Sequence, residues 1–213
     1  MESPKHPFGD TMSNSTDIDF SLYPRWNDSC IWRTQDEGLL IFKIEQQSTQ
    51  GDSEEFTDIR HIVLNREGKD AWMLCTGVHT GEEIVNMLKK EYEGDEKSIQ
   101  KDVTEMIATL LEEGYLLLED SPHPARHDLD EKAYPKRSDD AIANVVEDNF
   151  VIMSMKTSHV YSFDKNVEYL WDICDGIHTV GEILSTAANT DETLFLLNFL
   201  IRLGFLELKN YTG

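Results

Sequence analysis

Residues 64–84, LNREGKDAWMLCTGVHTGEEI, return later in the chain as residues 163–183, FDKNVEYLWDICDGIHTVGEI, at a constant offset of 99. Seven of the 21 aligned positions are identical, and they include a tryptophan and a cysteine. The likeness resumes between LLEEGYLLLE (110–119) and LIRLGFLELK (200–209), where the offset falls to 90, so the second copy is nine residues shorter between its last two helices. A repeat of this kind indicates a tandem duplication of one structural unit.

Each copy has the residue spacing of consecutive helices. Apolar residues between positions 64 and 75 recur at three- and four-residue steps, which is typical of one buried helix face. We expect Asn65 and Asp164 to cap the first helix of each copy, because their side chains accept hydrogen bonds from free backbone N–H groups. The stretches TGEE (80–83) and TVGE (179–182) predict capping boxes at the start of the second helix.

Strand signals precede the helices in both copies. The second copy has FVIMSMKTSHVYSF (150–163), in which a Lys-Thr-Ser turn joins two apolar runs. The first copy has CIWRT (30–34), GLLIFKI (38–44) and DIRHIVL (58–64), and we expect the polar insertion at 45–56 to lengthen the last hairpin. The expected fold class is α+β, with two winged-helix-like modules that each consist of short antiparallel strands followed by three helices.

The modules are expected at residues 28–119 and 145–213. The segment 120–144 between them lacks apolar periodicity and is rich in proline, so we expect a linker. Residues 1–27 are polar and predict a tail that is disordered or loosely docked. Its aromatic residues either pack simply against the first module, which we favour, or occupy a peptide site of their own chain. These residues are Phe20, Tyr23 and Trp26.

The charge of the chain limits its partners. With 19 basic and 41 acidic residues the formal net charge is −22, which argues against nucleic acid and against an anionic membrane surface. The charge serves solubility, or it speeds the encounter with a basic partner. No apolar stretch has the length of a membrane helix, and the N-terminus lacks the apolar core of a secretion signal, so we expect a cytoplasmic protein.

No catalytic constellation is present in the sequence. The three cysteines have no disulfide or zinc-ribbon spacing. Cys75 with His79 and Cys174 with His178 would make a zinc site only if the two copies faced each other, and core packing of the cysteines is the favoured interpretation. There is no iron–sulfur motif, glycine-rich phosphate loop or nucleophile elbow. We therefore expect no enzyme activity, no metal and no cofactor.

The order of the motifs resembles the PqqD family. Strands are followed by a helix that begins Leu-Asn and ends near Cys-x-Gly, by a His-Thr-x-x-Glu-Ile helix, and by a helix that ends Leu-x-x-x-Gly-Tyr-Leu. In the first copy the matching positions are Leu64, Asn65, Trp72, Gly77, Thr80, Glu83, Ile84, Leu110, Leu111, Gly114, Tyr115 and Leu116. In the second copy they are Trp171, Gly176, Thr179, Glu182, Ile183, Leu200, Gly204, Phe205 and Leu206.

The resemblance implies a peptide-binding protein without catalysis of its own. PqqD-like domains are recognition elements for ribosomally synthesised and post-translationally modified peptides (RiPPs), and they present the leader of a precursor peptide to a modifying enzyme, often a radical SAM protein. The leader binds as a strand added beside the third strand and against the third helix. In the first module this implies Asp58, Arg60, His61, Ile62, Val63, Leu64, Asp102, Glu105, Met106 and Thr109. In the second module it implies Ser158, His159, Val160, Tyr161, Ser162, Phe195 and Asn198.

Two other functions stay open at this point. One is a winged-helix regulator that binds DNA, although the third helix of the first copy offers Glu105 and Glu112 where a basic face is needed. The other is a scaffold that joins two enzymes through its two modules. Within the peptide-binding interpretation, one module binds the leader while the other binds the enzyme or stabilises the pair.

Overall fold

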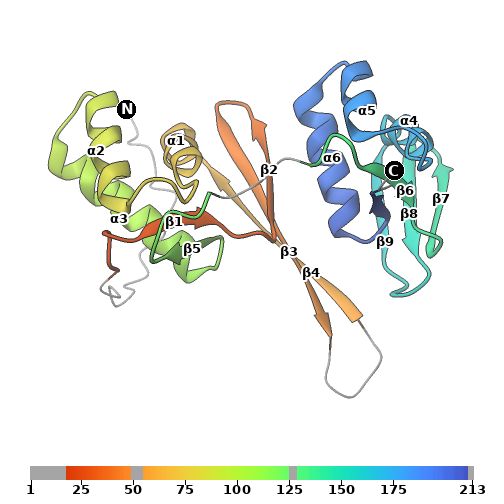
Figure 1. Cartoon of the computed structure of the whole chain (residues 1–213), viewed down its shortest axis with the longest axis horizontal. Coiled ribbons are helices and arrows are strands. Elements are labelled where there is room, and N and C mark those ends of the chain that lie inside the picture. The colour runs from red at the N-terminus through yellow and green to blue at the C-terminus, as the bar shows by residue number, and fades with distance from the viewer. Residues whose placement is uncertain (1–17, 49–54, 125–128, 211–213) are drawn as a thin grey trace.

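The same order of secondary structure occurs twice in the chain. The structure is a computed structural model that describes residues 18–48, 55–124 and 129–210. The first module contains β1 (Tyr23–Trp26), β2 (Cys30–Gln35), β3 (Gly38–Ser48), β4 (Glu55–Leu64), α1 (Arg66–Leu74), α2 (Gly81–Glu91), α3 (Glu96–Glu112) and β5 (Leu116–Glu119). The second contains β6 (Tyr134–Arg137), β7 (Ala141–Val146), β8 (Asn149–Ser154), β9 (Val160–Asp164), α4 (Val167–Ile173), α5 (Val180–Thr186), α6 (Thr190–Arg202) and β10 (Leu206–Lys209). The α+β class and the two strand-plus-helix modules are confirmed (Figure 1).

Each module has a three-stranded antiparallel sheet and a separate two-stranded sheet. The strand orders are β2-β3-β4 and β7-β8-β9 in the larger sheets, and β1-β5 and β10-β6 in the smaller ones. None of the helices in the described ranges has the length and apolarity needed to cross a membrane.

The expected helix caps are confirmed with one exception. Asn65 accepts a hydrogen bond from the backbone of α1, and Thr80 and Thr179 form the capping boxes of α2 and α5. The predicted cap at Asp164 is wrong, because this residue is the last of β9 and the cap position of α4 is Asn166, which makes no side-chain capping bond. A tight turn, in which the N–H of Glu168 donates to the carbonyl of Lys165, starts α4 instead.

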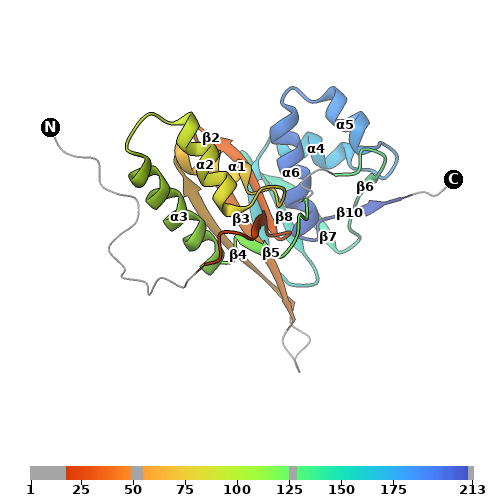
Figure 2. The same cartoon turned by 60° about the vertical axis from the view of Figure 1, so that its left-hand side comes forward.

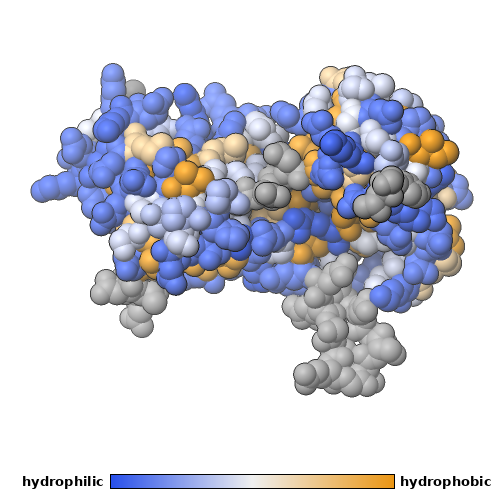
Figure 3. All heavy atoms as spheres, viewed as in Figure 1, coloured by the Kyte–Doolittle hydropathy of each residue, from blue (hydrophilic) through white to orange (hydrophobic). Residues whose placement is uncertain are grey.

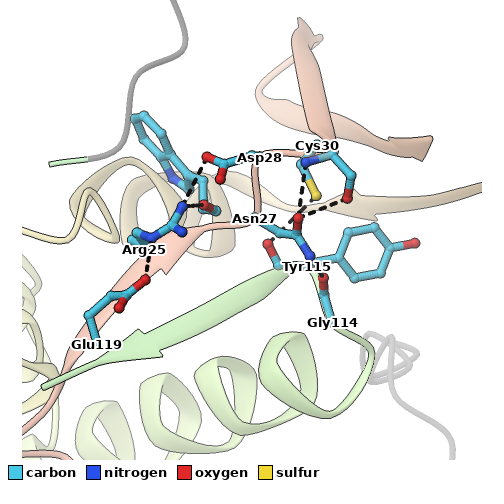
Figure 4. Close-up of polar contacts among 9 residues, drawn as sticks. Arg25, Asn27, Asp28, Cys30, Gly114, Tyr115 and Glu119 are labelled. Carbon is cyan, nitrogen blue, oxygen red and sulfur yellow. Dashed lines mark hydrogen bonds and ion pairs between the residues drawn. The ribbon is translucent and has the colours of Figure 1, made fainter. Parts of the chain in front are cut away.

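The described part of the N-terminal tail is a strand that pairs with the end of the first module. Arg25 Nε of β1 donates to Glu119 Oε1 of β5 at 2.6 Å, and Asn27 Nδ2 donates to the Gly114 carbonyl at 2.8 Å (Figure 4). The side chain of Trp26 packs against the core of this module, as does that of Phe20. This agrees with simple packing of the aromatic residues; residues 1–17 lie outside the described ranges.

The segment expected to be a linker also contains strand structure. Residues 134–137 form β6, which pairs with β10, and β7 begins at Ala141. The Gly176 N–H donates to the Pro135 carbonyl, as the Gly77 N–H does to the Pro24 carbonyl. The stretches YPR (23–25) and YPK (134–136) are a further part of the repeat, which the helix motifs alone did not predict. Proline is compatible with these short two-stranded sheets because both strands are edge strands, where a residue without an N–H group does not interrupt a hydrogen-bond ladder.

The polar insertion lengthens the β3–β4 hairpin, as the sequence predicts. Its ladder continues from the pair Ile44 and Ile59 to the pair Ser48 and Glu55, so both strands extend into the polar insertion. In Figure 1 the two strands project beyond the rest of the molecule. Polar residues do not end a strand where each backbone group still has a partner across the ladder.

The two modules share a packed interface. One face of the β2-β3-β4 sheet, with Leu39 and Ile41, covers helices α1 to α3 in one core. The opposite face, with Ile31 and Ile44, belongs to the core of the second module. The sheet of the first module therefore lies between its own helices and α6, as Figures 1 and 2 both show.

Candidate functional site

The outer edge of β4 is unpaired among the described residues. A two-residue turn joins β2 to β3, so Gln35 and Gly38, the pair that closes the turn, exchange backbone hydrogen bonds. Along an antiparallel pair of strands, hydrogen-bonded and non-hydrogen-bonded pairs then alternate, so every second residue of β3 directs its backbone groups toward β4. By this alternation Leu64, Ile62 and Arg60 bond inward to β3. The residues between them therefore direct their N–H and C=O groups outward, where a further strand can accept and donate. These residues are Ile59, His61 and Val63.

Side chains along this edge alternate between the two faces of the sheet. Leu64 is buried, and Ile62 is partly buried in the core that contains Met106 of α3. Val63 points to the opposite face and is 61% exposed, which is high for a large apolar residue. His61 is exposed on the same face, and its ring centroid lies 6.0 Å from that of Phe42. The edge thus offers free backbone groups beside an exposed apolar side chain.

Charged side chains form a chain of ion pairs at the other end of the edge. Lys43 Nζ lies 3.1 Å from Glu45 Oε1, and Arg60 bridges Glu45 at 3.0 Å and Asp58 at 3.4 Å. The hydrogen bond from Lys43 holds the pKa of Glu45 below its ordinary range, and the bond to Glu45 raises the pKa of Arg60. Asp58 and Arg60, both predicted site residues, are therefore already paired with each other.

Helix α3 and strand β4 contribute to the same core, in which Met106 of α3 and Ile62 of β4 take part. Met106 is buried in the core, and the Thr109 hydroxyl donates to the Glu105 carbonyl within the helix at 2.9 Å. Asp102 and Glu105 are exposed, and Lys101 Nζ lies 3.7 Å from Glu105 Oε1. Figure 3 shows a largely hydrophilic surface at the end of the molecule where α2 and α3 lie. The exposed side of α3 is therefore polar and acidic.

The corresponding strand of the second module, β9, is also unpaired on its outer side among the described residues. Val160 and Ser162 are exposed, whereas Tyr161 and Phe163 face the core. Ser158 and His159 precede the strand, and Ser158 has a positive φ of 60°. These two predicted site residues therefore belong to the turn before β9.

The side of β9 that faces α6 is filled by the first module. Phe42 of β3 lies 5.9 Å from Phe195 and 5.4 Å from Phe199 between ring centroids, and Phe199 lies 6.1 Å from Phe163 of β9. Phe195 is buried, as is Asn198, whose Nδ2 donates to the Leu194 carbonyl at 3.0 Å. The first module therefore covers the face of α6 that lies beside Phe163 of β9.

This contact between the modules was not predicted from the sequence, although a signal for it exists. At an offset of 90, Phe195 and Phe199 of α6 correspond to Glu105 and Thr109 of α3. Two phenylalanines four residues apart add an apolar stripe that the first copy lacks. Such a stripe on one copy only indicates a surface that is covered in that copy.

The repeated cysteines are core residues. Cys75 and Cys174 are fully buried in the cores of different modules, and burial raises the pKa of each thiol to about 12. His79 lies beside Glu83, while His178 contacts Asp175. Within the described ranges no group of three or more histidine, cysteine or acidic side chains is arranged to hold a metal ion.

Comparisons with known proteins place a family match in the first module. Residues 57–116 match the model of the family described as coenzyme PQQ synthesis protein D (PqqD). The matched segment includes most of β4, helices α1 to α3 and the first residue of β5. No curated protein matches the chain.

Two solved structures are similar to parts of the chain. TbiB1 in complex with the TbiA(beta) leader peptide is 18% identical over 43% of this chain and 93% of that one, with a TM-score of 0.32. PKMT2 from Rickettsia typhi is 15% identical over 88% of this chain and 43% of that one, with a TM-score of 0.28.

Proposed function

We propose that this chain binds the leader of a RiPP precursor peptide as a strand added to the outer edge of β4. The observation that carries the proposal is the unpaired edge of β4, which lies within the segment that matches the PqqD family. Ile59, His61 and Val63 supply backbone donors and acceptors there. Such edges recognise extended peptides because main-chain hydrogen bonds give affinity and alternate side chains give selectivity.

The first module is favoured over the second as the binding module. Both third strands have a free edge in the described ranges, but only β4 has an uncovered helix beside it. Next to β9, the rings of Phe42, Phe195 and Phe199 fill the corresponding space. We assign the second module the task of supporting the first sheet from behind, which leaves the predicted residues of β9 and α6 without a peptide.

In this proposal the chain delivers its peptide to a separate modifying enzyme and performs no catalysis itself. PqqD-like domains imply such a division of labour, with a radical SAM protein as the partner that the resemblance favours. The repeated order of elements supports an origin by tandem duplication. The exposed acidic residues of α3, such as Asp102 and Glu105, speak against the alternative of a DNA-binding helix.

The direct test is isothermal titration of the full chain with the leader of the short peptide encoded beside its gene. We expect saturable binding, together with slower amide exchange at His61 and Val63, because an added strand protects outward N–H groups. A folded sample that binds no such peptide, or binds it without protection of β4, would contradict the proposal.

A further inference from the structure

The added strand has two rows of side chains, and the structure distinguishes what each row meets. In a β-strand, successive side chains point to opposite faces. On one face an added strand would lie beside Ile62 and Leu64 of β4, in the core that also holds Met106 of α3; on the other face it would lie beside Val63 of β4. The chemistry of these two surroundings restricts the peptide, and this restriction rests on the proposed function.

The exposed side of α3 carries negative charge. Asp102 and Glu105 are exposed on this helix, with Lys101 as the basic residue paired to Glu105. At the start of the edge, Arg60 is held by Glu45 and Asp58. Near the end of α3 the charged groups are the exposed acids Glu112 and Glu113 and the base Lys43, whose Nζ donates to the Glu113 carbonyl at 3.5 Å. Acidic residues outnumber basic residues here, so a basic side chain of the peptide should strengthen binding and an acidic side chain should weaken it.

The second module shows what this side of the third helix binds. Glu192 of α6 corresponds to Asp102, and its Oε1 lies 3.1 Å from Nη1 of Arg33 on strand β2. The Arg33 guanidinium also lies over the ring of Phe195, which corresponds to Glu105, at 5.5 Å from the centroid. A basic side chain on a β-strand therefore already occupies this position beside α6.

The other row of the added strand meets an apolar side chain. Val63 is 61% exposed although it sits in a strand whose neighbours Ile62 and Leu64 are covered. A cross-strand apolar partner would remove its side chain from water, and this stabilises a pair of strands. The exposure of Val63 thus indicates, independently of the charges on α3, that the second row of peptide side chains is apolar.

We infer that the chain selects a leader segment in which basic and apolar residues alternate, with the basic row against α3 and the apolar row beside Val63. This accounts for the difference between α3 and α6 at equivalent positions: the second helix meets its own chain through phenylalanine, and the first meets a foreign strand through acids. The selection acts on the peptide and leaves the backbone ladder unchanged.

The test uses three synthetic eight-residue peptides with blocked ends. One alternates Lys and Val, one alternates Glu and Val, and one has four Lys followed by four Val. We expect the alternating Lys peptide to bind about tenfold more tightly than either of the others at low salt, because two exposed charge pairs contribute on this scale. High salt should reduce its advantage over the Glu peptide.

Variants separate the two rows. Glu105→Lys should remove the preference for Lys over Glu, whereas Glu207→Lys, a change at an exposed residue of β10, should keep it. Val63→Ser should weaken the alternating Lys peptide, and Val160→Ser is the matched control because Val160 is 60% exposed on β9.

The outcomes distinguish this inference from the proposed function. Equal binding of all three peptides at β4 would overturn the inference and leave strand addition intact. The inference is also overturned, with strand addition intact, if the encoded leader binds and the alternating Lys peptide does not. If neither the encoded leader nor any of the three peptides binds to the folded chain, the proposed function fails, and the inference fails with it.

Discussion

The strand–helix pairs β4–α3 and β9–α6 have the same fold and opposite surroundings. Both β4 and β9, the last strands of the two three-stranded sheets, have a free outer edge among the described residues. Beside α6 the aromatic rings of Phe195 and Phe199 bind the sheet of the first module, while α3 has Glu105 and Thr109 at the same positions. Two differences on one helix face, Glu105 against Phe195 and Thr109 against Phe199, therefore distinguish the exposed face of α3 from the packed face of α6. The secondary structure is the same in both.

The largest expected effect comes from breaking the packed pair. Phe195→Ala should lower the free energy of unfolding by about 3 to 5 kcal/mol, because it leaves a cavity between the modules. Glu105→Ala, at the equivalent position of α3, should change it by about 0.5 kcal/mol or less, since this side chain is exposed. Urea unfolding followed by tryptophan fluorescence measures both. Equal losses would contradict the asymmetry of the two helices.

A second prediction concerns the two free edges. Val63→Pro removes an outward N–H of β4 and should weaken leader binding by about tenfold to a hundredfold, the scale of one lost backbone hydrogen bond. Ser162→Pro removes the equivalent N–H of β9 and should leave binding unchanged. Titration calorimetry with the encoded leader compares them, after circular dichroism shows that both variants are folded. Loss of binding in Ser162→Pro alone would move the site to the second module.

The capping boxes should contribute equally to stability in both modules, so that the difference between the modules is confined to the surroundings of α3 and α6. The Glu83 N–H donates to Thr80 Oγ1 at 3.2 Å and the Glu182 N–H donates to Thr179 Oγ1 at 3.1 Å. Thr80→Ala and Thr179→Ala should each lower stability by about 1 kcal/mol. Thermal unfolding tests this, with Thr→Ser at each site as the control that keeps the hydroxyl. A loss in one module only would mean that the modules differ in their helix starts as well.

The smallest effect is a pH dependence in the second module. The Thr179 N–H donates to Glu182 Oε2 at 2.8 Å, and this bond lowers the pKa of Glu182. A lowered pKa in the folded state means that the contribution to stability is complete above the ordinary glutamate pKa of about 4.3 and is lost as the pH falls through the lowered value. Glu182→Gln should flatten the fall in stability on acidification, while Thr179→Ser should keep it. Unfolding midpoints across the acid range provide the measurement.

Local features of the fold could be predicted from sequence because they depend on residues close together in the chain. The capping boxes, the cap at Asn65 and the end of α3 at Gly114 follow from such local chemistry. Asp164 failed as a cap because an equally local tight turn starts α4 two residues later. The strands β1 and β6 were missed because short strands with proline have weak local signals and gain their stability from distant partners.

The candidate site was foreseen as a set of segments but not as a choice between modules. The sequence by itself determined the repeat, the class of fold and the acidic character of α3, since all three are properties of residue order and composition. Only the tertiary structure decided that Phe42 covers α6 and that Val63 remains exposed. The reason is physical: the phenylalanine stripe of α6 indicates that this helix face is covered, but which distant segment covers it, and whether a strand edge stays free, depends on the tertiary packing.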